Sequence, residues 1–129
     1  MTTTPDDNGM ASVLSAQSKY DEAEHFLRAA VSAVEAACGP DSYEVAVASE
    51  QLAQVLATTG RGEEATAIYR QVLRIKRDTL GAGHPEVLEA VHNLALLLDA
   101  AGDSHEAQSL WGEARAALAG RPHADEGAS

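Results

Sequence analysis

Histidine and cysteine are the side chains of this 129-residue chain best suited to bind a metal ion, and their spacing argues against a metal site. His84 and His92 lie eight residues apart, and the other three histidines fall in other predicted elements. No His-x-x-x-His pair or cysteine cluster accompanies them, as zinc sites require. Cys38 is the single cysteine, so no intrachain disulfide can form, and it ends an apolar helical pattern as a small buried residue. We therefore expect no metal and no cofactor.

The sequence also lacks the spacing patterns of common catalytic sites. It contains no glycine-rich phosphate loop between a strand and a helix, no strand pattern and no Gly-x-Ser-x-Gly motif. Its carboxylates fall mostly on predicted exposed helix faces, whereas catalytic acids and bases gather in clefts that shift their pKa. We therefore expect that the chain is not an enzyme.

Basic side chains concentrate in one predicted helix, where Arg70, Arg74 and Arg77 share a face next to Lys76. Such a face can bind an anion or an acidic peptide. It can also be a solvated helix end whose dipole favours cations. Acidic neighbours on the same helix favour the second interpretation.

The composition is that of a small helical domain. Hydrophobic residues make up 45% of the chain but aromatic residues only 4%, so the core must consist of Ala, Leu and Val. A formal charge of −11 repels phosphate backbones and anionic lipids, which argues against nucleic acid and membrane partners. Since the sequence has neither a long apolar run nor a secretory signal, we expect a cytoplasmic protein.

The parts of the chain are related by a period of about 42 residues, which we call the repeat interval. Gly60 aligns with Gly102 at this interval, and Gly39 aligns with Gly81. The other matching pairs are Leu52 with Leu94, Ala53 with Ala95, Leu56 with Leu98 and Ala65 with Ala107. A third, weaker copy consists of Met10, Ala11, Leu14, Ser18, Glu22 and Ala23. A fixed period of this size indicates a stack of repeats, each of which cannot bury its apolar face alone.

Apolar periodicity predicts an antiparallel helix pair in each copy, with glycine ending the helices. The predicted helices are residues 10–17, a partner that runs from Tyr20 through Val34, 42–59, 63–80, 85–101 and 104–118. We therefore expect an all-α fold of three stacked antiparallel helix pairs with a shortened first helix. The expected organisation is a flexible segment 1–9, a single domain 10–119 with repeats 10–38, 39–80 and 81–119, and a disordered tail 120–129.

One motif recurs in the two complete copies and carries a family resemblance. It consists of Leu52, Ala53, Leu56, Gly60, Glu64, Ala65 and Tyr69, and then of Leu94, Ala95, Leu98, Gly102, Glu106, Ala107 and Trp111. This pattern resembles the tetratricopeptide repeat (TPR), whose usual period is about 34 residues. The longer period, with GAGHPEV at 81–87 and VHNLALLL at 91–98, resembles the kinesin-light-chain type. The resemblance implies a short right-handed TPR solenoid.

The resemblance also implies a concave groove, lined by the first helix of each pair, that receives a segment of another protein. The side chains that this register places in the groove are Ser12, Glu50, Gln51, Gln54, Thr58, Glu89, His92, Asn93 and Asp99. Asn93 stands where kinesin-light-chain repeats often hold the ligand, and Gln51 is its equivalent one repeat earlier. Amides suit this task because they offer a donor and an acceptor to a peptide backbone. The alternative is that both are ordinary solvated residues.

The expected function is a protein-protein interaction module that binds a protein or peptide in this groove. Acidic groove residues favour a basic partner, unless they serve only solubility. Self-association as a homodimer is the alternative, because three repeats leave apolar faces at both ends. Its candidate contacts are Leu110, Trp111 and Leu118, which otherwise pack against the preceding helix. Small-molecule binding or catalysis in the groove would need an enclosed pocket, which the sequence does not indicate.

Overall fold

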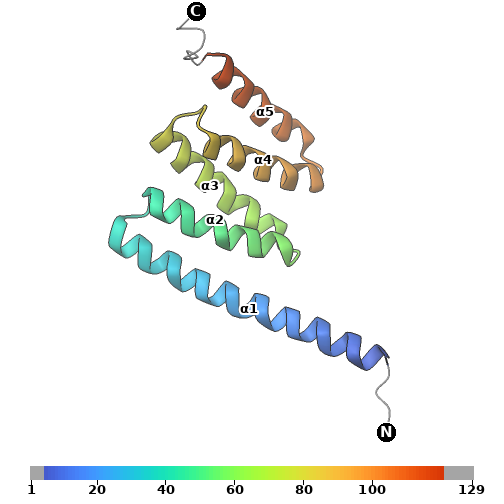
Figure 1. The fold of residues 1–129 in the computed structure, drawn as a ribbon. Coiled ribbons are helices and arrows are strands. Elements are labelled where there is room, and N and C mark those ends of the chain that lie inside the picture. The colour runs from blue at the N-terminus through green and yellow to red at the C-terminus, as the bar shows by residue number, and fades with distance from the viewer. Residues whose placement is uncertain (1–4, 121–129) are drawn as a thin grey trace, which may run out of the picture.

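The computed structural model describes the backbone of residues 5–120 and the side chains of residues 16–120. All regular secondary structure in this range is α-helical, so the predicted all-α class is confirmed. The helices are α1 (Pro5–Cys38), α2 (Tyr43–Thr58), α3 (Gly62–Leu80), α4 (Pro85–Ala100) and α5 (Ser104–Ala119). Figure 1 shows them stacked in chain order, with α1 at one end and α5 at the other. Each helix packs against the next one along the chain.

Glycine shapes the turns between the helices. Gly39, Gly60, Gly81 and Gly102 all have positive φ values, between 83° and 96°. A side chain would be strained at such a φ, and glycine is not. These are the same glycines that align at the repeat interval, so the sequence period corresponds to a structural repeat.

Capping side chains fix where the first helix of each complete pair begins. The Ser42 hydroxyl accepts a hydrogen bond from the Val45 amide at 3.2 Å and starts α2. At the equivalent position, His84 Nδ1 accepts from the Glu86 amide at 3.1 Å and starts α4. Pro85 follows as the first helical residue, where its missing amide costs no hydrogen bond.

The first repeat differs from the prediction. Residues 10–17 and the segment from Tyr20 onward do not form two helices, because α1 is continuous from Pro5 to Cys38. Ser18 stands where Gly60 and Gly102 have positive φ, and a residue with a side chain disfavours that turn and continues the helix. Residues 5–120 therefore form five helices instead of three antiparallel pairs.

Two other sequence expectations concern the ends of α1. The helix begins at Pro5, inside the segment 1–9 that was expected to be flexible, whereas residues 1–4 and 121–129 lie outside the described residues. Cys38 is exposed at the end of α1, so the prediction of a buried cysteine is wrong. The reason is that α1 is the end helix of the stack and packs against α2 only on one side.

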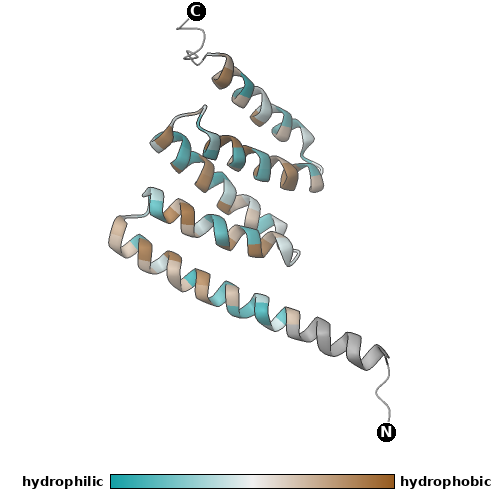
Figure 2. Cartoon of the chain, in the orientation of Figure 1, coloured by the Kyte–Doolittle hydropathy of each residue, from teal (hydrophilic) through white to brown (hydrophobic). Residues whose placement is uncertain are grey.

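Small and branched aliphatic side chains build the core, as the composition predicts. The main buried cluster consists of Leu52, Ala53, Leu56, Ala65, Tyr69, Leu73, Val87, Ala90, Val91, Leu94, Ala95, Leu98, Ala107 and Ala114. A smaller cluster between α2 and α3 consists of Ala46, Val72 and Ile75. Figure 2 shows hydrophobic and hydrophilic residues alternating around the helices. Each helix is therefore amphipathic and depends on its neighbours for cover.

Lys76 of α3 is a buried cation that ties α2 to α4. Its Nζ lies 3.2 Å from Glu50 Oε1 in α2 and 3.2 Å from Glu86 Oε1 in α4, and the residue is 3% exposed. The Tyr43 hydroxyl donates a hydrogen bond to Glu86 Oε1 at 2.7 Å. Burial lowers the pKa of Lys76, but the two carboxylates outweigh this effect and raise it overall. Lys76 therefore stays charged and fixes α2 and α4 relative to each other. We call α2 and α4, which begin the two complete helix pairs, the first-type helices, and α1, α3 and α5 the second-type helices.

Ion pairs connect the second helices of successive repeats at a constant spacing. Arg28 of α1 pairs with Glu64 of α3, and Arg70 of α3 pairs with Glu106 of α5, each across 36 residues. The two arginines are one repeat interval apart, as are the two glutamates, so the pair itself is repeated. These exposed pairs fix the register of the stack more than its stability.

The basic face of α3 is used within the chain. Besides Arg70, Arg74 pairs with Asp41 at 2.8 Å and Arg77 pairs with Glu113 at 3.4 Å. The carboxylates neutralise the cations that an anion site would need. This pairing supports the interpretation of a solvated helix face.

The lowered carboxyl pKa values predict loss of stability in acid. Hydrogen bonds from Arg28 and Arg61 lower the pKa of Glu24 and Glu64 below the ordinary value of 4.5. A carboxyl whose pKa is lower in the folded state stabilises the fold above its unfolded pKa, and this contribution disappears as pH falls through the folded value. We expect the melting temperature, followed by circular dichroism, to fall as pH is lowered below about 4.5.

The double variant Arg28→Gln/Arg61→Gln is the matched control for this titration. Without the arginines, both carboxyls should titrate near their ordinary pKa, so the acid dependence should become shallower. An identical dependence in the variant and the wild-type chain would contradict this assignment.

Replacing the buried lysine should be costly. Lys76→Met leaves Glu50 and Glu86 without their cation, and loss of one partner of a buried pair typically costs about 3 kcal/mol or more. Urea denaturation should show this loss in the free energy of unfolding. Adding Glu50→Gln should restore part of it, whereas Arg74→Met, at an exposed pair, should have little effect. Equal losses for Lys76→Met and Arg74→Met would refute the proposed role of Lys76.

Candidate peptide-binding surface

A hollow of about 390 Å³ lies on the helices that were expected to line a groove. Its lining residues are Gln54, Ala57 and Thr58 of α2, Tyr69 of α3, and Asn93, Leu96 and Leu97 of α4. We call this site the α2–α4 hollow. It brings together three of the predicted groove residues, Gln54, Thr58 and Asn93.

Amide side chains supply the hydrogen-bonding groups of the α2–α4 hollow. Asn93 of α4 is half-buried, and within residues 16–120 its side chain makes no hydrogen bond. Gln54 of α2 is exposed. The Thr58 hydroxyl donates to the Gln54 carbonyl oxygen at 2.8 Å, which holds the threonine side chain against its own helix. The Asn93 amide therefore keeps both its donor and its acceptor available.

Tyr69 of α3 lies beneath the amides and is 3% exposed. Burial, followed by the charges of Glu50 and Glu89, raises the pKa of Tyr69 to about 12, although a hydrogen bond with Gln54 acts in the opposite direction. The hydroxyl therefore stays protonated at neutral pH. Its contact with Gln54 connects the second helix of the repeat to the hollow.

The sequence analysis missed the apolar part of the hollow. Leu96 is 56% exposed, although it lies in the interior of α4. The helical pattern of α4 needs Leu94 and Leu98 for the core, so Leu96 was an apolar residue that the core did not require. This extra apolar residue was the signal in the sequence from which the apolar part of the hollow could have been predicted. Leu96 also stands one repeat interval after Gln54, so the equivalent positions of α2 and α4 offer an amide and an aliphatic side chain.

Two predicted groove residues are engaged in contacts within the chain. Glu50 binds the buried Lys76, and its side chain is 15% exposed. The His92 ring meets the Trp111 ring edge to face, with the ring centroids 5.9 Å apart. Neither residue lines the α2–α4 hollow.

Three other predicted groove residues are exposed but separate from the hollow. Gln51, Glu89 and Asp99 are exposed and do not belong to its lining. The side chain of Ser12 lies outside the described residues. The structure therefore divides the predicted set into a compact group around Asn93 and a scattered remainder.

The candidate self-association residues lie on α5, and two of them pack inside the chain. Leu110 and Trp111 are partly buried against the main cluster. Leu118 is half-buried near the end of α5. The first two side chains therefore already have intramolecular partners, which was the alternative interpretation.

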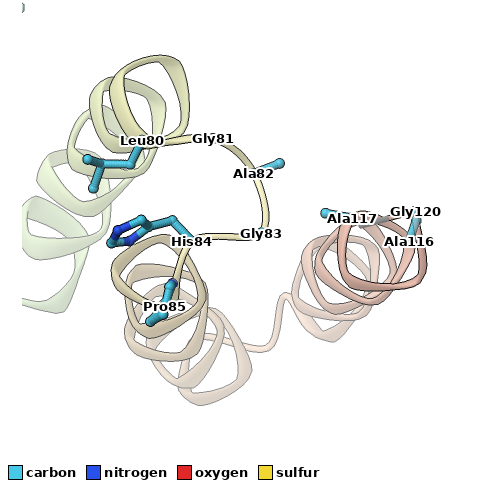
Figure 3. A pocket seen from close by; sticks show the side chains of 9 residues that line it. All are labelled: Leu80, Gly81, Ala82, Gly83, His84, Pro85, Ala116, Ala117 and Gly120. Atoms are coloured by element: carbon cyan, nitrogen blue, oxygen red, sulfur yellow. The ribbon is translucent and has the colours of Figure 1, made fainter. Parts of the chain in front are cut away.

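A second, larger hollow of about 510 Å³ lies between the α3–α4 turn and the end of α5, as Figure 3 shows. Its lining residues are Leu80, Gly81, Ala82, Gly83, His84, Pro85, Ala116, Ala117 and Gly120. The His84 ring points towards Leu80, and its Nδ1 is occupied by the Glu86 amide. The other side chains of this lining are apolar or absent. It offers little that could orient a ligand.

The described residues offer neither a metal site nor a membrane-spanning helix. In the part of the chain that the structure describes, no group of three or more His, Cys, Asp or Glu residues could hold a metal ion. No helix among the described residues has the length and apolar character needed to cross a membrane.

Comparison with known proteins assigns the chain to a family. No curated protein gave a significant match. A family model described as tetratricopeptide repeat matches residues 7–78 and, in a second overlapping position, residues 44–119. Such repeats generally mediate interactions between proteins. The two matches cover most of the sequence and agree with the stacked helices, and we conclude that this chain belongs to the tetratricopeptide repeat family.

Proposed function

We propose that this protein is a non-catalytic binding module that holds a peptide segment of another protein in the α2–α4 hollow. The observation that carries the proposal is the meeting of a free amide, Asn93, with an exposed aliphatic side chain, Leu96, at a hollow on the first-type helices. Family membership supports the general function, and the lining of the hollow supports this location for it.

The two side chains suit a peptide in complementary ways. An amide can donate to a backbone carbonyl and accept from a backbone amide, whatever the peptide sequence. Leu96 offers apolar area that an aliphatic or aromatic side chain of the peptide would bury. Because α2 and α4 are joined by Lys76, the hollow is preformed and binding requires little ordering of the helices.

The chemistry of the lining favours binding over catalysis. Tyr69 is the one titratable residue among the lining side chains, and its pKa is raised to about 12. General acid-base catalysis near neutral pH works best with a group whose pKa lies near 7. The lining also lacks a carboxylate, a histidine or a cysteine that could act as a nucleophile or metal ligand.

The charge around the hollow supports a partner with Lys or Arg near its bound segment. Glu89 and Asp99 are exposed on α4, and the whole chain carries a formal charge of −11. Glu50 contributes less than expected, because Lys76 neutralises it. A basic partner would be attracted before contact and would associate faster.

Self-association is a second candidate function. It is favoured by an observation at the α1 end of the stack, where Phe26 is 72% exposed. We place it there and not on α5, because Leu110 and Trp111 already pack against the core.

Variants in the hollow should weaken partner binding without unfolding the chain. A partner captured from native extract and identified by mass spectrometry would be titrated by calorimetry against each variant. Asn93→Ala should weaken binding about 10-fold, because loss of one or two hydrogen bonds costs about 1 to 2 kcal/mol. Leu96→Glu should weaken it at least as much by placing a charge on the apolar contact.

Gln51→Ala is the matched control, since Gln51 is the repeat equivalent of Asn93 but lies outside the lining. It should bind as tightly as the wild-type chain. If Asn93→Ala and Leu96→Glu also bind normally, the α2–α4 hollow is not the docking site. If Gln51→Ala is the variant that fails, the contact lies elsewhere on α2.

A further inference from the structure

The end helix α1 exposes a face that is covered in the next repeat. Phe26 is 72% exposed and Ala33 is exposed, although both lie inside a long helix. Their equivalents one repeat interval later in α3 are Ile68, which is partly buried, and Ile75, which is 1% exposed. The exposed face of α1 is therefore one that the repeat architecture normally buries.

The helix that covers this face in α3 is the first helix of the same repeat. Ile75 and Val72 form a buried cluster with Ala46 of α2, and Ile68 packs against it. On α1, in contrast, the side that faces α2 is occupied, since Leu27 and Val31 pack against the main cluster. What α1 lacks is a first-type helix on its other side.

The chain contains a sequence of the missing type. Met10, Ala11 and Leu14 are the repeat equivalents of Leu52, Ala53 and Leu56 of α2. The backbone of residues 10–17 belongs to the same continuous helix as Phe26, so this segment extends along the helix axis and cannot fold back onto the exposed face. Figure 1 shows this part of α1 projecting beyond α2.

We propose that two copies of the chain exchange these segments, so that residues 10–17 of each copy cover the Phe26 face of the other. This arrangement rests on the second function proposed above, self-association, and not on the α2–α4 hollow. It is a two-fold symmetric dimer in which the two α1 helices run antiparallel. The segment that would be intramolecular in a complete repeat is supplied by the partner.

The register of the α2–α3 pair gives the position of the symmetry axis. Those helices reverse direction around Gly60 and Arg61, which are the repeat equivalents of Ser18 and Lys19. An axis that passes beside Ser18 and Lys19 would place residues 10–17 of one copy opposite residues 20–27 of the other, as α2 lies against α3, so the segment covers Phe26 and leaves Ala33 beyond its end. This point falls well inside α1, so both arms of the helix are available for the contact.

Turn chemistry explains why the exchange occurs between copies. Gly60 has a φ of 83° and Gly62 begins α3, whereas the equivalent residues of the first repeat are Ser18 and Tyr20. A side chain at the Ser18 position would be strained in the turn, and the straight helix avoids this strain. A hinge that cannot close within one chain is a common origin of segment exchange.

The mass of the full chain in solution is the first test. Light scattering at micromolar concentrations should give twice the chain mass of 13.5 kDa. Phe26→Glu should raise the dimer dissociation constant at least about 100-fold, because the symmetric interface loses the burial of two phenylalanines. The helix content of this variant should be unchanged, since Phe26 is exposed within the single chain.

Leu96→Glu is the matched control for an exposed apolar residue. It should remain a dimer although it loses partner binding. The variant therefore distinguishes a failure of the segment exchange from a failure of binding in the α2–α4 hollow. A monomeric wild-type chain would refute the exchange and leave this face free or covered by another protein. A dimer that survives Phe26→Glu would place the interface elsewhere, for example on α5.

Grafting the α2–α3 turn into α1 tests the exchange itself. The substitutions Gln17→Thr, Ser18→Gly, Lys19→Arg and Tyr20→Gly give the first repeat the sequence found at residues 59–62. The graft should let residues 10–17 fold back on their own chain, so we expect a monomer whose melting temperature no longer depends on concentration. A grafted chain that remains a dimer would show that the two copies do not exchange this segment.

Discussion

The second-type helix α3 has apolar side chains on more than one face, so no single neighbour can shield it from water. Tyr69 and Leu73 belong to the main buried cluster, whereas Val72 and Ile75 pack with Ala46 of α2. Stacking satisfies this requirement because each added helix covers one face and offers another. The turn glycines and the ion pairs then fix the order and register of helices that already have to pack. The same requirement is unmet at α1, and the proposed exchange follows from it.

Much of this fold could be predicted from the sequence, because the local and the repeated signals agree over the two complete copies. The positive-φ turns fall on the recurring glycines, and α2 and α4 begin within one residue of the predicted starts at 42 and 85. In the first copy these signals disagree. The apolar pattern of residues 10–17 indicates a separate helix, but Ser18 occupies the position of the turn glycine. Because α1 is continuous through this position, the missing glycine decides the local structure and the apolar pattern does not.

The site could be predicted only where register decides it. Asn93 was predicted from its place in the repeat, and in the structure it lines the α2–α4 hollow. The ion pair of Glu50 could not be predicted from the sequence. It joins Glu50 to Lys76, 26 positions away, and depends on how two helices meet. Leu96 and Tyr69 were overlooked for a different reason. A leucine or tyrosine with helical spacing is assigned to the core by default, and only the three-dimensional arrangement shows that one is exposed and the other lies under the hollow.

The side chains lining the α2–α4 hollow are uncharged at neutral pH, while Glu89 and Asp99 lie outside that lining. Mobile ions screen long-range attraction strongly and short contacts between neutral groups only slightly. Raising the ionic strength would therefore slow the arrival of a bound protein without much shortening the time it stays. The lifetime of such a complex and its speed of formation would be set by separate parts of the same helix, α4, and each could change through evolution without the other.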